Sequence, residues 1–378
     1  MDNPRLTHIE AAPLAGKRPR NAGCNARLPV HGIDVQEPFA RLRFEDGSSG
    51  FGFSRVSAAQ AEALLDQPLD SLITLENGSV ASAHSIEFPL WDVLGQRADQ
   101  PLYRLLSRLS TPVGTPYTVP CYDTSLYFDD LHLADNDAAA ALIAGEARFG
   151  YDCGHRAFKL KIGRGALHMP LIEGTQRDIA VIRAVRAAVG AGLPLMIDAN
   201  NGYNINLAKW VLTETANCDI FWLEEPFNED RTLYEHLHQW MKEAGLSVLI
   251  ADGEGYAAPV LLDWARDGAI NVVQYDLRDI GLSAWRTLGA QLDRWGVRSA
   301  PHNYGSAFGN YATCHLASAI EHFTFAEWDQ IDLDGLDTTS YSINEGHVLV
   351  PDAPGFGLRL DEAIFTQAIT TGGFTVSL

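Results

Sequence analysis

Ionisable side chains stand at the ends of several short apolar segments in this 378-residue chain. Examples are the runs Met196-Ile197-Asp198 and Trp222-Leu223-Glu224. If these runs are parallel strands of one barrel, their carboxyl ends meet at one face and the side chains there form a single site. The full set is Lys159, Lys161, Asp198, Glu224, Glu254, Asp276, His302 and Glu327.

Three carboxylates of this set, those of Asp198, Glu224 and Glu254, suit a hard divalent cation. Mg²⁺ prefers oxygen ligands and keeps positions open for water or substrate, whereas zinc prefers His or Cys, and neither stands beside these three. Side chains alternate along a strand, so only one of Glu224 and Glu225 points into the site, and we assign Glu224. Asp252 shares a strand face with Glu254, so spacing alone leaves Asp252 open as the third ligand.

Two lysines and a histidine add groups that transfer protons. Lys159 and Lys161 share one strand face, and two neighbouring ammonium groups lower each other's pKa toward the range of a general base. His302 serves the other side of the pocket if Asp276 accepts a hydrogen bond from one ring nitrogen. Glu327, if held protonated, can donate to a developing enediolate oxygen. The chemistry indicated is removal of a proton next to a carboxylate.

The elements that position these groups alternate between strand and helix. Segments with helical periodicity, such as 177–189 and 207–217, separate the β-type runs, which is typical of a parallel α/β sheet. Eight strands favour a closed barrel over an open sheet, and no G-x-G-x-x-G follows an early strand to anchor a dinucleotide. We expect the strands at 119–124, 157–161, 195–198, 220–224, 248–252, 272–275, 297–300 and 323–328.

The N-terminal part has a different rhythm. Alternation at 39–44 followed by the turn-forming residues 45–50 predicts a hairpin, and helices are expected at 58–65 and 80–97. A Pro/Gly-rich stretch at 111–116 suits a boundary. We therefore expect an α+β capping domain over residues 1–115, to which 350–378 return, and a catalytic barrel over 116–349.

Composition and charge exclude several classes of protein. A formal net charge of −20 argues against nucleic acid as a partner, because nucleic-acid binding depends on clustered Lys and Arg. The 5 cysteines are an odd number without a paired C-x-x-C, and we interpret them as reduced thiols. No run reaches the roughly 18 apolar residues of a membrane span, and no signal-peptide pattern opens the chain. These features predict a cytoplasmic protein that binds neither nucleic acid nor membrane.

The ordered set of strand-end residues resembles the enolase superfamily, specifically its mandelate racemase subgroup. The stretch 87–95 and the motifs Lys159-x-Lys161 and Glu224-Glu225-Pro226 belong to the same resemblance. It implies an α/β fold: a modified TIM barrel, (β/α)₇β, with an α+β capping domain. For the site it implies Mg²⁺ held by Asp198, Glu224 and Glu254, Lys161 as base on one face with Lys159 as electrophilic helper, the His302/Asp276 pair on the opposite face, and Glu327 beside the enediolate.

Bases on both faces leave two reactions open, and both pass through one enediolate. We expect dehydration of an acid sugar, an aldonate or aldarate, to a 2-keto-3-deoxy acid; the alternative is a racemase or epimerase of a 2-hydroxy acid. A barrel that only binds carbohydrate or metal is a second alternative, and the two lysines with His302 argue against it. A homo-oligomer is expected because the cap leaves surface uncovered. The candidate substrate-binding residues are Asn200, Tyr122, Arg20 and Asn25.

Overall fold

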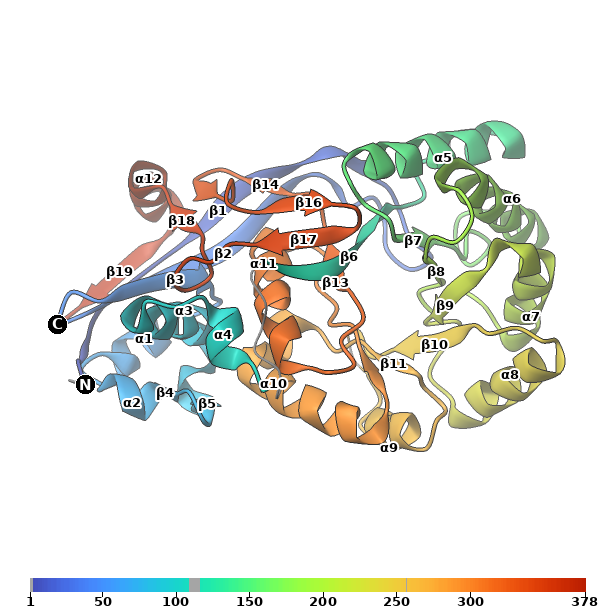
Figure 1. The fold of residues 1–378 in the computed structure, drawn as a ribbon. Coiled ribbons are helices and arrows are strands. Elements are labelled where there is room, and N and C mark those ends of the chain that lie inside the picture. The colour runs from blue at the N-terminus through green and yellow to red at the C-terminus, as the bar shows by residue number, and fades with distance from the viewer. Residues whose placement is uncertain (1–2, 109–115, 256) are drawn as a thin grey trace.

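The computed structural model describes residues 3–108, 116–255 and 257–378, and within them two main sheets lie side by side (Figure 1). One sheet is small and antiparallel, and it lies at the end of the molecule that carries both termini. The other is the larger sheet of parallel strands. The expected domain boundary falls on 111–116, of which 111–115 lie outside the described residues.

The parallel strands form the expected barrel. Their order is β12-β11-β10-β9-β8-β7-β6, with β13 on the other side of β6, and a bridge between Ser299 and Phe323 brings β12 next to the segment before β13. One helix follows each strand except the last, which gives (β/α)₇β and confirms the expected fold. The strands are β6 (Tyr117–Leu126), β7 (Phe158–Lys161), β8 (Leu195–Asp198), β9 (Ile220–Glu224), β10 (Leu249–Asp252), β11 (Val272–Val273), β12 (Arg298–Ser299) and β13 (Ala326–Trp328). The helices between them are α5 (Asn136–Asp152), α6 (Leu171–Val189), α7 (Ile205–Glu214), α8 (Arg231–Glu243), α9 (Leu261–Arg266), α10 (Leu277–Trp295) and α11 (Ala307–Leu316).

The antiparallel sheet is built mainly from the N-terminal segment. Long strands β1 and β2 pair along their length, and β2 and β3 form the predicted hairpin. Two late segments return to it, because β14 and β19 both pair with β1. The elements are β1 (Leu6–Ala22), β2 (Gly32–Phe44), β3 (Ser49–Phe53), β14 (Asp332–Leu333) and β19 (Phe374–Ser377), with helices α1 (Ala58–Leu64), α2 (Leu69–Leu72), α3 (Glu87–Ala98), α4 (Leu102–Leu106) and α12 (Glu362–Gly372).

Short strands join or flank these two sheets. β17 pairs antiparallel with the first residues of β6 and with β16, so a late hairpin extends the barrel sheet. Elsewhere the short strands form two-stranded pairs. The elements are β4 (Ile73–Thr74), β5 (Gly78–Ser79), β15 (Leu336–Asp337), β16 (Ser342–Asn344), β17 (His347–Val350) and β18 (Arg359–Leu360). Across the described segments, no helix combines the length and apolarity that crossing a membrane needs.

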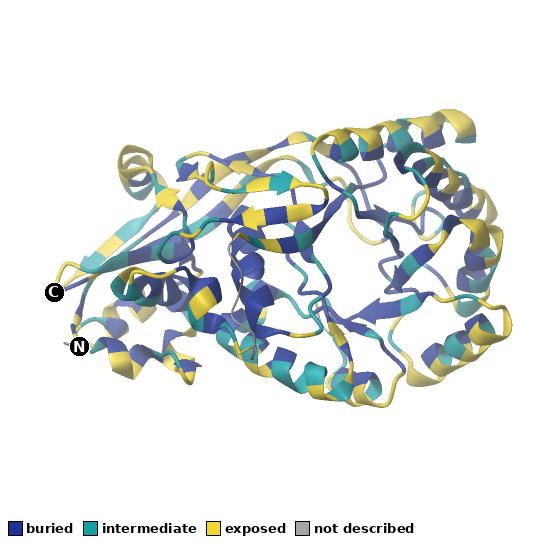
Figure 2. Ribbon diagram, viewed as in Figure 1, coloured by how far each residue is buried: buried dark blue, intermediate teal, exposed yellow. Residues whose placement is uncertain are grey.

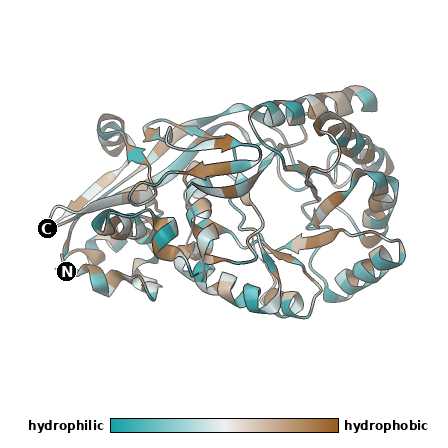
Figure 3. Ribbon diagram, in the orientation of Figure 1, coloured by the Kyte–Doolittle hydropathy of each residue, from teal (hydrophilic) through white to brown (hydrophobic). Residues whose placement is uncertain are grey.

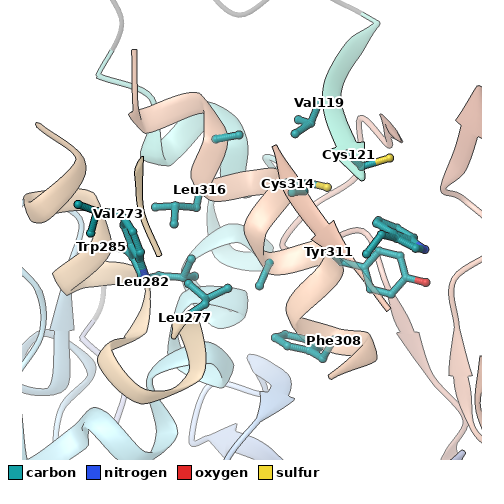
Figure 4. Close-up of a cluster of buried hydrophobic side chains, with 14 of the residues drawn as sticks. Val119, Cys121, Val273, Leu277, Leu282, Trp285, Phe308, Tyr311, Cys314 and Leu316 are labelled. Atoms are coloured by element: carbon teal, nitrogen blue, oxygen red, sulfur yellow. The ribbon is translucent and has the colours of Figure 1, made fainter. Parts of the chain in front are cut away.

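Burial follows from the barrel topology. Every residue of β7 and β8 is buried, as parallel strands covered on both faces require (Figure 2). The outer helices are amphipathic and expose their polar faces (Figure 3). Helix α11 is the exception, because all its residues are buried, and Figure 4 shows Phe308, Tyr311 and Cys314 of this helix within the core.

Glu37 of β2 ties the small sheet to the barrel. Its carboxylate accepts hydrogen bonds from Ser306 Oγ and from the main-chain N–H groups of Ala307 (2.9 Å) and Phe308 (3.2 Å). These donors form the N-terminus of α11, where a carboxylate is favoured by unpaired N–H groups. Glu37 is only 1% exposed, and burial raises its pKa to about 7.

Replacing Glu37 with Ala leaves three buried donors unpaired. We expect Glu37→Ala to lower the free energy of unfolding by about 2–4 kcal/mol. The control is Glu235→Ala, which removes an exposed ion pair with Arg231 on α8 and costs less than about 0.5 kcal/mol. Denaturant unfolding of both variants makes the comparison, and equal losses contradict this role of Glu37.

Candidate active site

The parallel register brings three predicted site residues to one level of the barrel. Lys161 is the neighbour of Asp198 across β7 and β8, and Asp198 is the neighbour of Glu224 across β8 and β9. Glu254 follows two residues after the end of β10. One carboxylate oxygen from each of Asp198, Glu224 and Glu254 lies within 4.8 Å of the other two.

Neutral donors orient these carboxylates in addition to the ion pairs described below. Glu224 Oε2 accepts from Trp222 Nε1 and from Gln274 Nε2, both at 2.9 Å, and Asp198 Oδ1 accepts from the Asn200 main-chain N–H at 2.9 Å. Glu254 Oε2 is buried and has His302 Nε2 as its charged neighbour, at 3.2 Å. A group of three carboxylates that offers only oxygen ligands within 4.8 Å of one another fits Mg²⁺ and not zinc.

The structure decides between Glu254 and Asp252. Asp252 accepts from the Tyr234 hydroxyl and from the Gly253 N–H (2.7 Å), so its carboxylate is turned toward α8 and away from the cluster. The alternation argument fails here because β10 ends at Asp252 and Gly253 has φ +126°, which takes the chain out of the strand. Asp252 is therefore not the third member of the cluster.

Glu225 is a part of the site to which the sequence analysis assigned no role. It has φ 40°, and its carboxylate accepts from Asn200 Nδ2 (3.0 Å) and Asn201 Nδ2 (2.9 Å). Asn200 Nδ2 also lies 3.2 Å from Glu254 Oε1, so Asn200 links this outer carboxylate to the cluster. Burial, with Glu254 and Asp198 nearby, raises the pKa of Glu225 to about 10.

The lysines form ion pairs inside the site, which corrects the expected direction of their pKa. Lys159 Nζ lies 2.7 Å from Glu224 Oε1 and 2.9 Å from Glu327 Oε1, and Lys161 Nζ pairs with Asp198. Burial alone would lower both lysine pKa values, but these carboxylates outweigh burial and raise them. The mutual repulsion of the two ammonium groups is the smaller effect, because each has a closer carboxylate.

His302 and Asp276 form the predicted pair. His302 Nδ1 lies 2.9 Å from Asp276 Oδ2, while Nε2 lies 3.2 Å from Glu254 Oε2. Asp276 is also the N-cap of α10, so one carboxylate both begins a helix and orients the imidazole. Burial would lower the pKa of His302, yet Glu254 and Glu327 outweigh burial and raise it to about 9.

Glu327 lies where it was expected but is ionised. It accepts from Thr124 Oγ1 (2.7 Å) and the Asn303 N–H (2.6 Å) in addition to its ion pair with Lys159. Burial raises its pKa, but Lys159 and His302 have the larger combined effect and lower it below the ordinary value. The condition set above for donation by Glu327, that it be held protonated, is therefore not met in this arrangement of charges.

Of the four expected substrate-binding residues, Arg20 and Asn25 are engaged in contacts outside the carboxylate cluster. Tyr122 is fully buried inside the barrel against Trp222, and its ring centroid lies 5.3 Å from Lys159 Nζ at the site. The guanidinium of Arg20 donates to Ser125 and pairs with Asp129 and Glu146, so it joins β1 to the barrel. Asn25 Oδ1 accepts from the N–H groups of the next turn, those of Arg27 and Leu28. Asn200 donates to Glu254 of the cluster.

An aromatic group that the sequence analysis missed borders the site. Tyr127 lies just beyond β6, Tyr304 lies two residues after His302, and the two ring centroids are 5.0 Å apart. His31, from the segment between β1 and β2, packs edge-on against both rings. No motif marks these residues, and only their common place beside the mouth of the barrel reveals them.

The carboxylate cluster lies at the carboxyl ends of barrel strands and is flanked by two lysines and a histidine. This arrangement defines a site for metal-assisted proton transfer. The family described as enolase C-terminal domain-like matches residues 142–364. The chain belongs to this family, which confirms the expected membership of the enolase superfamily.

Solved structures and a characterised relative show the same likeness. A galacturonate dehydratase from Geobacillus sp., complexed with D-galacturonate and 5-keto-4-deoxy-D-galacturonate, is 44% identical, with a TM-score of 0.94 over 99% of both chains. A mandelate racemase/muconate lactonizing protein from Geobacillus sp. Y412MC10, complexed with magnesium and tartrate, is 44% identical, with a TM-score of 0.97 over 100% of this chain and 98% of the other. The arabinonate dehydratase of Saccharolobus solfataricus is 25% identical over 76% of this chain and 72% of its own.

The raised pKa of His302 makes a prediction about pH. A raised folded-state pKa stabilises the metal-free protein fully below the ordinary value of 6.5, and this contribution is lost as pH rises through about 9. We expect the free energy of unfolding of wild type to exceed that of His302→Gln by roughly 3 kcal/mol at about pH 6 and by much less at about pH 10. Denaturant unfolding in EDTA measures the difference, and a difference that grows with pH contradicts the assignment.

Proposed function

We propose that this protein is a Mg²⁺-dependent acid-sugar dehydratase that removes the proton next to the substrate carboxylate and expels the neighbouring hydroxyl. One observation carries the proposal: Lys161 and His302 approach the same carboxylate cluster from different strands, Lys161 at Asp198 and His302 at Glu254. The 44% identity to a galacturonate dehydratase supports the same reaction.

Asp198, Glu224 and Glu254 are the proposed Mg²⁺ ligands. When bound, the cation supplies Lewis-acid stabilisation of the negative charge that develops on the substrate carboxylate. Asp198 belongs both to this ligand set and to the ion pair of Lys161. Sharing Asp198 with a cation would weaken the hold of that carboxylate on the Lys161 proton, which favours the free amine that a base requires.

The proton transfers follow from the positions of the side chains. Lys161 Nζ takes the α-proton, and the electrons of the broken C–H bond form the enediolate, beside which Lys159 supplies a positive charge. His302 Nε2 then donates its proton to the β-hydroxyl, so that the C–O bond breaks and water leaves. Asp276 holds Nδ1 and keeps His302 charged before the transfer. The enol that remains tautomerises to the keto acid.

We propose a hexuronate as substrate within the acid-sugar class. The resemblance found in the sequence predicts an aldonate or aldarate, and the relatives include dehydratases named for aldonates as well as the galacturonate dehydratase. In a hexuronate the proton next to the carboxylate is on C5 and the leaving hydroxyl is on C4. The product is then a 5-keto-4-deoxy uronate.

We also propose the expected division of the chain, with residues 1–115 and 350–378 as the capping part and 116–349 as the catalytic barrel. Pairing of β19 with β1 and contact of α12 with β1 support the return of the C-terminal segment to the cap.

The test incubates the protein and Mg²⁺ with D-galacturonate, other uronates, aldonates and aldarates. Loss of one water is followed by mass spectrometry and NMR, since the aldehyde of a uronate interferes with carbonyl reagents. We expect dehydration of a uronate, and a decrease in kcat of about 10²–10⁴-fold for Lys161→Ala and for His302→Asn. His236→Phe, on the exposed face of α8, is the matched control with unchanged kcat.

Other outcomes separate the alternatives. Exchange of the α-proton in D₂O without loss of water moves the assignment to a racemase or epimerase. If the protein catalyses neither exchange nor dehydration of any acid sugar, the proposed function is contradicted and the protein is a binding protein.

A further inference from the structure

The side of the barrel opposite the carboxylate cluster carries aromatic side chains. Around the ring of eight strands, two cluster residues end β8 and β9 and the third follows β10, so β12, β13 and β6 lie across from them. Tyr127 follows β6, with its ring centroid 5.4 Å from Lys161 Nζ, and Tyr304 follows β12 just after His302. The two rings, with centroids 5.0 Å apart, therefore form an aromatic wall beside the proposed base and the loop of the proposed acid.

His31 completes this wall from the small sheet. Its ring centroid lies 4.9 Å from that of Tyr127 and 5.2 Å from that of Tyr304. Its main-chain N–H donates to Ala22 O at 3.0 Å, which fixes the backbone. The Nε2 atom is buried and has no hydrogen-bond partner in the described part of the chain, an arrangement that costs free energy unless a ligand supplies the partner.

The wall is neutral. Burial, with Lys161 and Arg18 nearby, lowers the pKa of His31 to about 4, so the imidazole is uncharged near pH 7. Arg18 lies over the Tyr304 ring at 4.8 Å, but it is buried and pairs in two contacts, of 2.8 and 3.1 Å, with Asp329. Arg20 is likewise engaged by acidic partners, Asp129 and Glu146. Arg278 donates to Tyr304 O at 2.9 Å and is paired with Asp276 at 3.4 Å.

We infer that His31 Nε2 hydrogen-bonds a neutral hydroxyl at the end of the substrate remote from its carboxylate, and that this wall selects mono-acids over aldarates. The inference rests on the proposed function, because the reacting carboxylate must lie at Asp198, Glu224 and Glu254. A substrate anchored there extends toward the opposite strands, β12, β13 and β6. A second carboxylate at its far end would meet two tyrosines, a neutral imidazole and an arginine already paired with Asp329.

The test compares D-galacturonate with galactarate, which differs from it only by oxidation of C1. Binding is measured by isothermal titration calorimetry with Mg²⁺, in a His302→Asn background that stops turnover. Three variants replace His31. The amide of His31→Gln reaches the position of Nε2, whereas that of His31→Asn reaches only the position of Nδ1. His31→Phe keeps a flat ring. His236→Phe is the matched control.

We expect D-galacturonate to bind at least about tenfold more tightly than galactarate when His31 is present. His31→Phe and His31→Asn weaken binding of D-galacturonate by about 5- to 100-fold, and His31→Gln stays within about threefold. The Gln and Asn variants make the comparison on their own if the Phe variant does not fold.

Equal affinity of the Gln, Asn and Phe variants overturns the inference, since a purely structural role would favour Phe. Galactarate binding as tightly as D-galacturonate overturns it too, and so does failure of both sugar acids to bind. Equilibrium binding does not require turnover, so absence of dehydration by wild type is a separate result that bears on the proposed function alone.

Discussion

The balance of buried charge at the mouth of the barrel is the constraint on which the rest of the structure depends. Asp198 and Glu224 are fully buried, and burying a carboxylate without a partner costs several kcal/mol. Lys159 meets this cost by contacting both Glu224 and Glu327, and Lys161 does so for Asp198. The same ion pairs hold Lys159, Lys161 and Glu327 beside the carboxylate cluster.

The scaffold fixes these charges through backbone register and through contacts from the small sheet. The pairing of Lys161 with Asp198, and of Asp198 with Glu224, follows from strand register alone. The loop after His302 needs more, because it has little regular structure of its own. Asp329, paired with Arg18, accepts from the Gly305 N–H at 3.0 Å, and Glu37 holds the start of the following helix. The small sheet thus positions the loop that carries His302.

The barrel and most of the site could be predicted from the sequence, because strand and helix alternate and the ionisable residues end the strands. The structure adds what depends on backbone turns and on distant contacts. The positive φ of Gly253 turns the chain out of the strand and Asp252 away from the cluster, and the alternation of side chains along a strand does not predict that turn. The lysine pKa direction depends on carboxylates from other strands, and His31 becomes part of the wall only through packing on Tyr127 and Tyr304.

The central claim is that Asp198, Glu224 and Glu254, one from each of three neighbouring strand ends, hold Mg²⁺. Calorimetric titration of Mg²⁺ into wild type, Glu224→Gln and Asp252→Asn tests it most directly. The account predicts that Glu224→Gln weakens binding by more than about 100-fold, beyond the usual effect of residues that only support a ligand, while Asp252→Asn stays within about tenfold. An equal loss in the two variants, or no loss in Glu224→Gln, would contradict it.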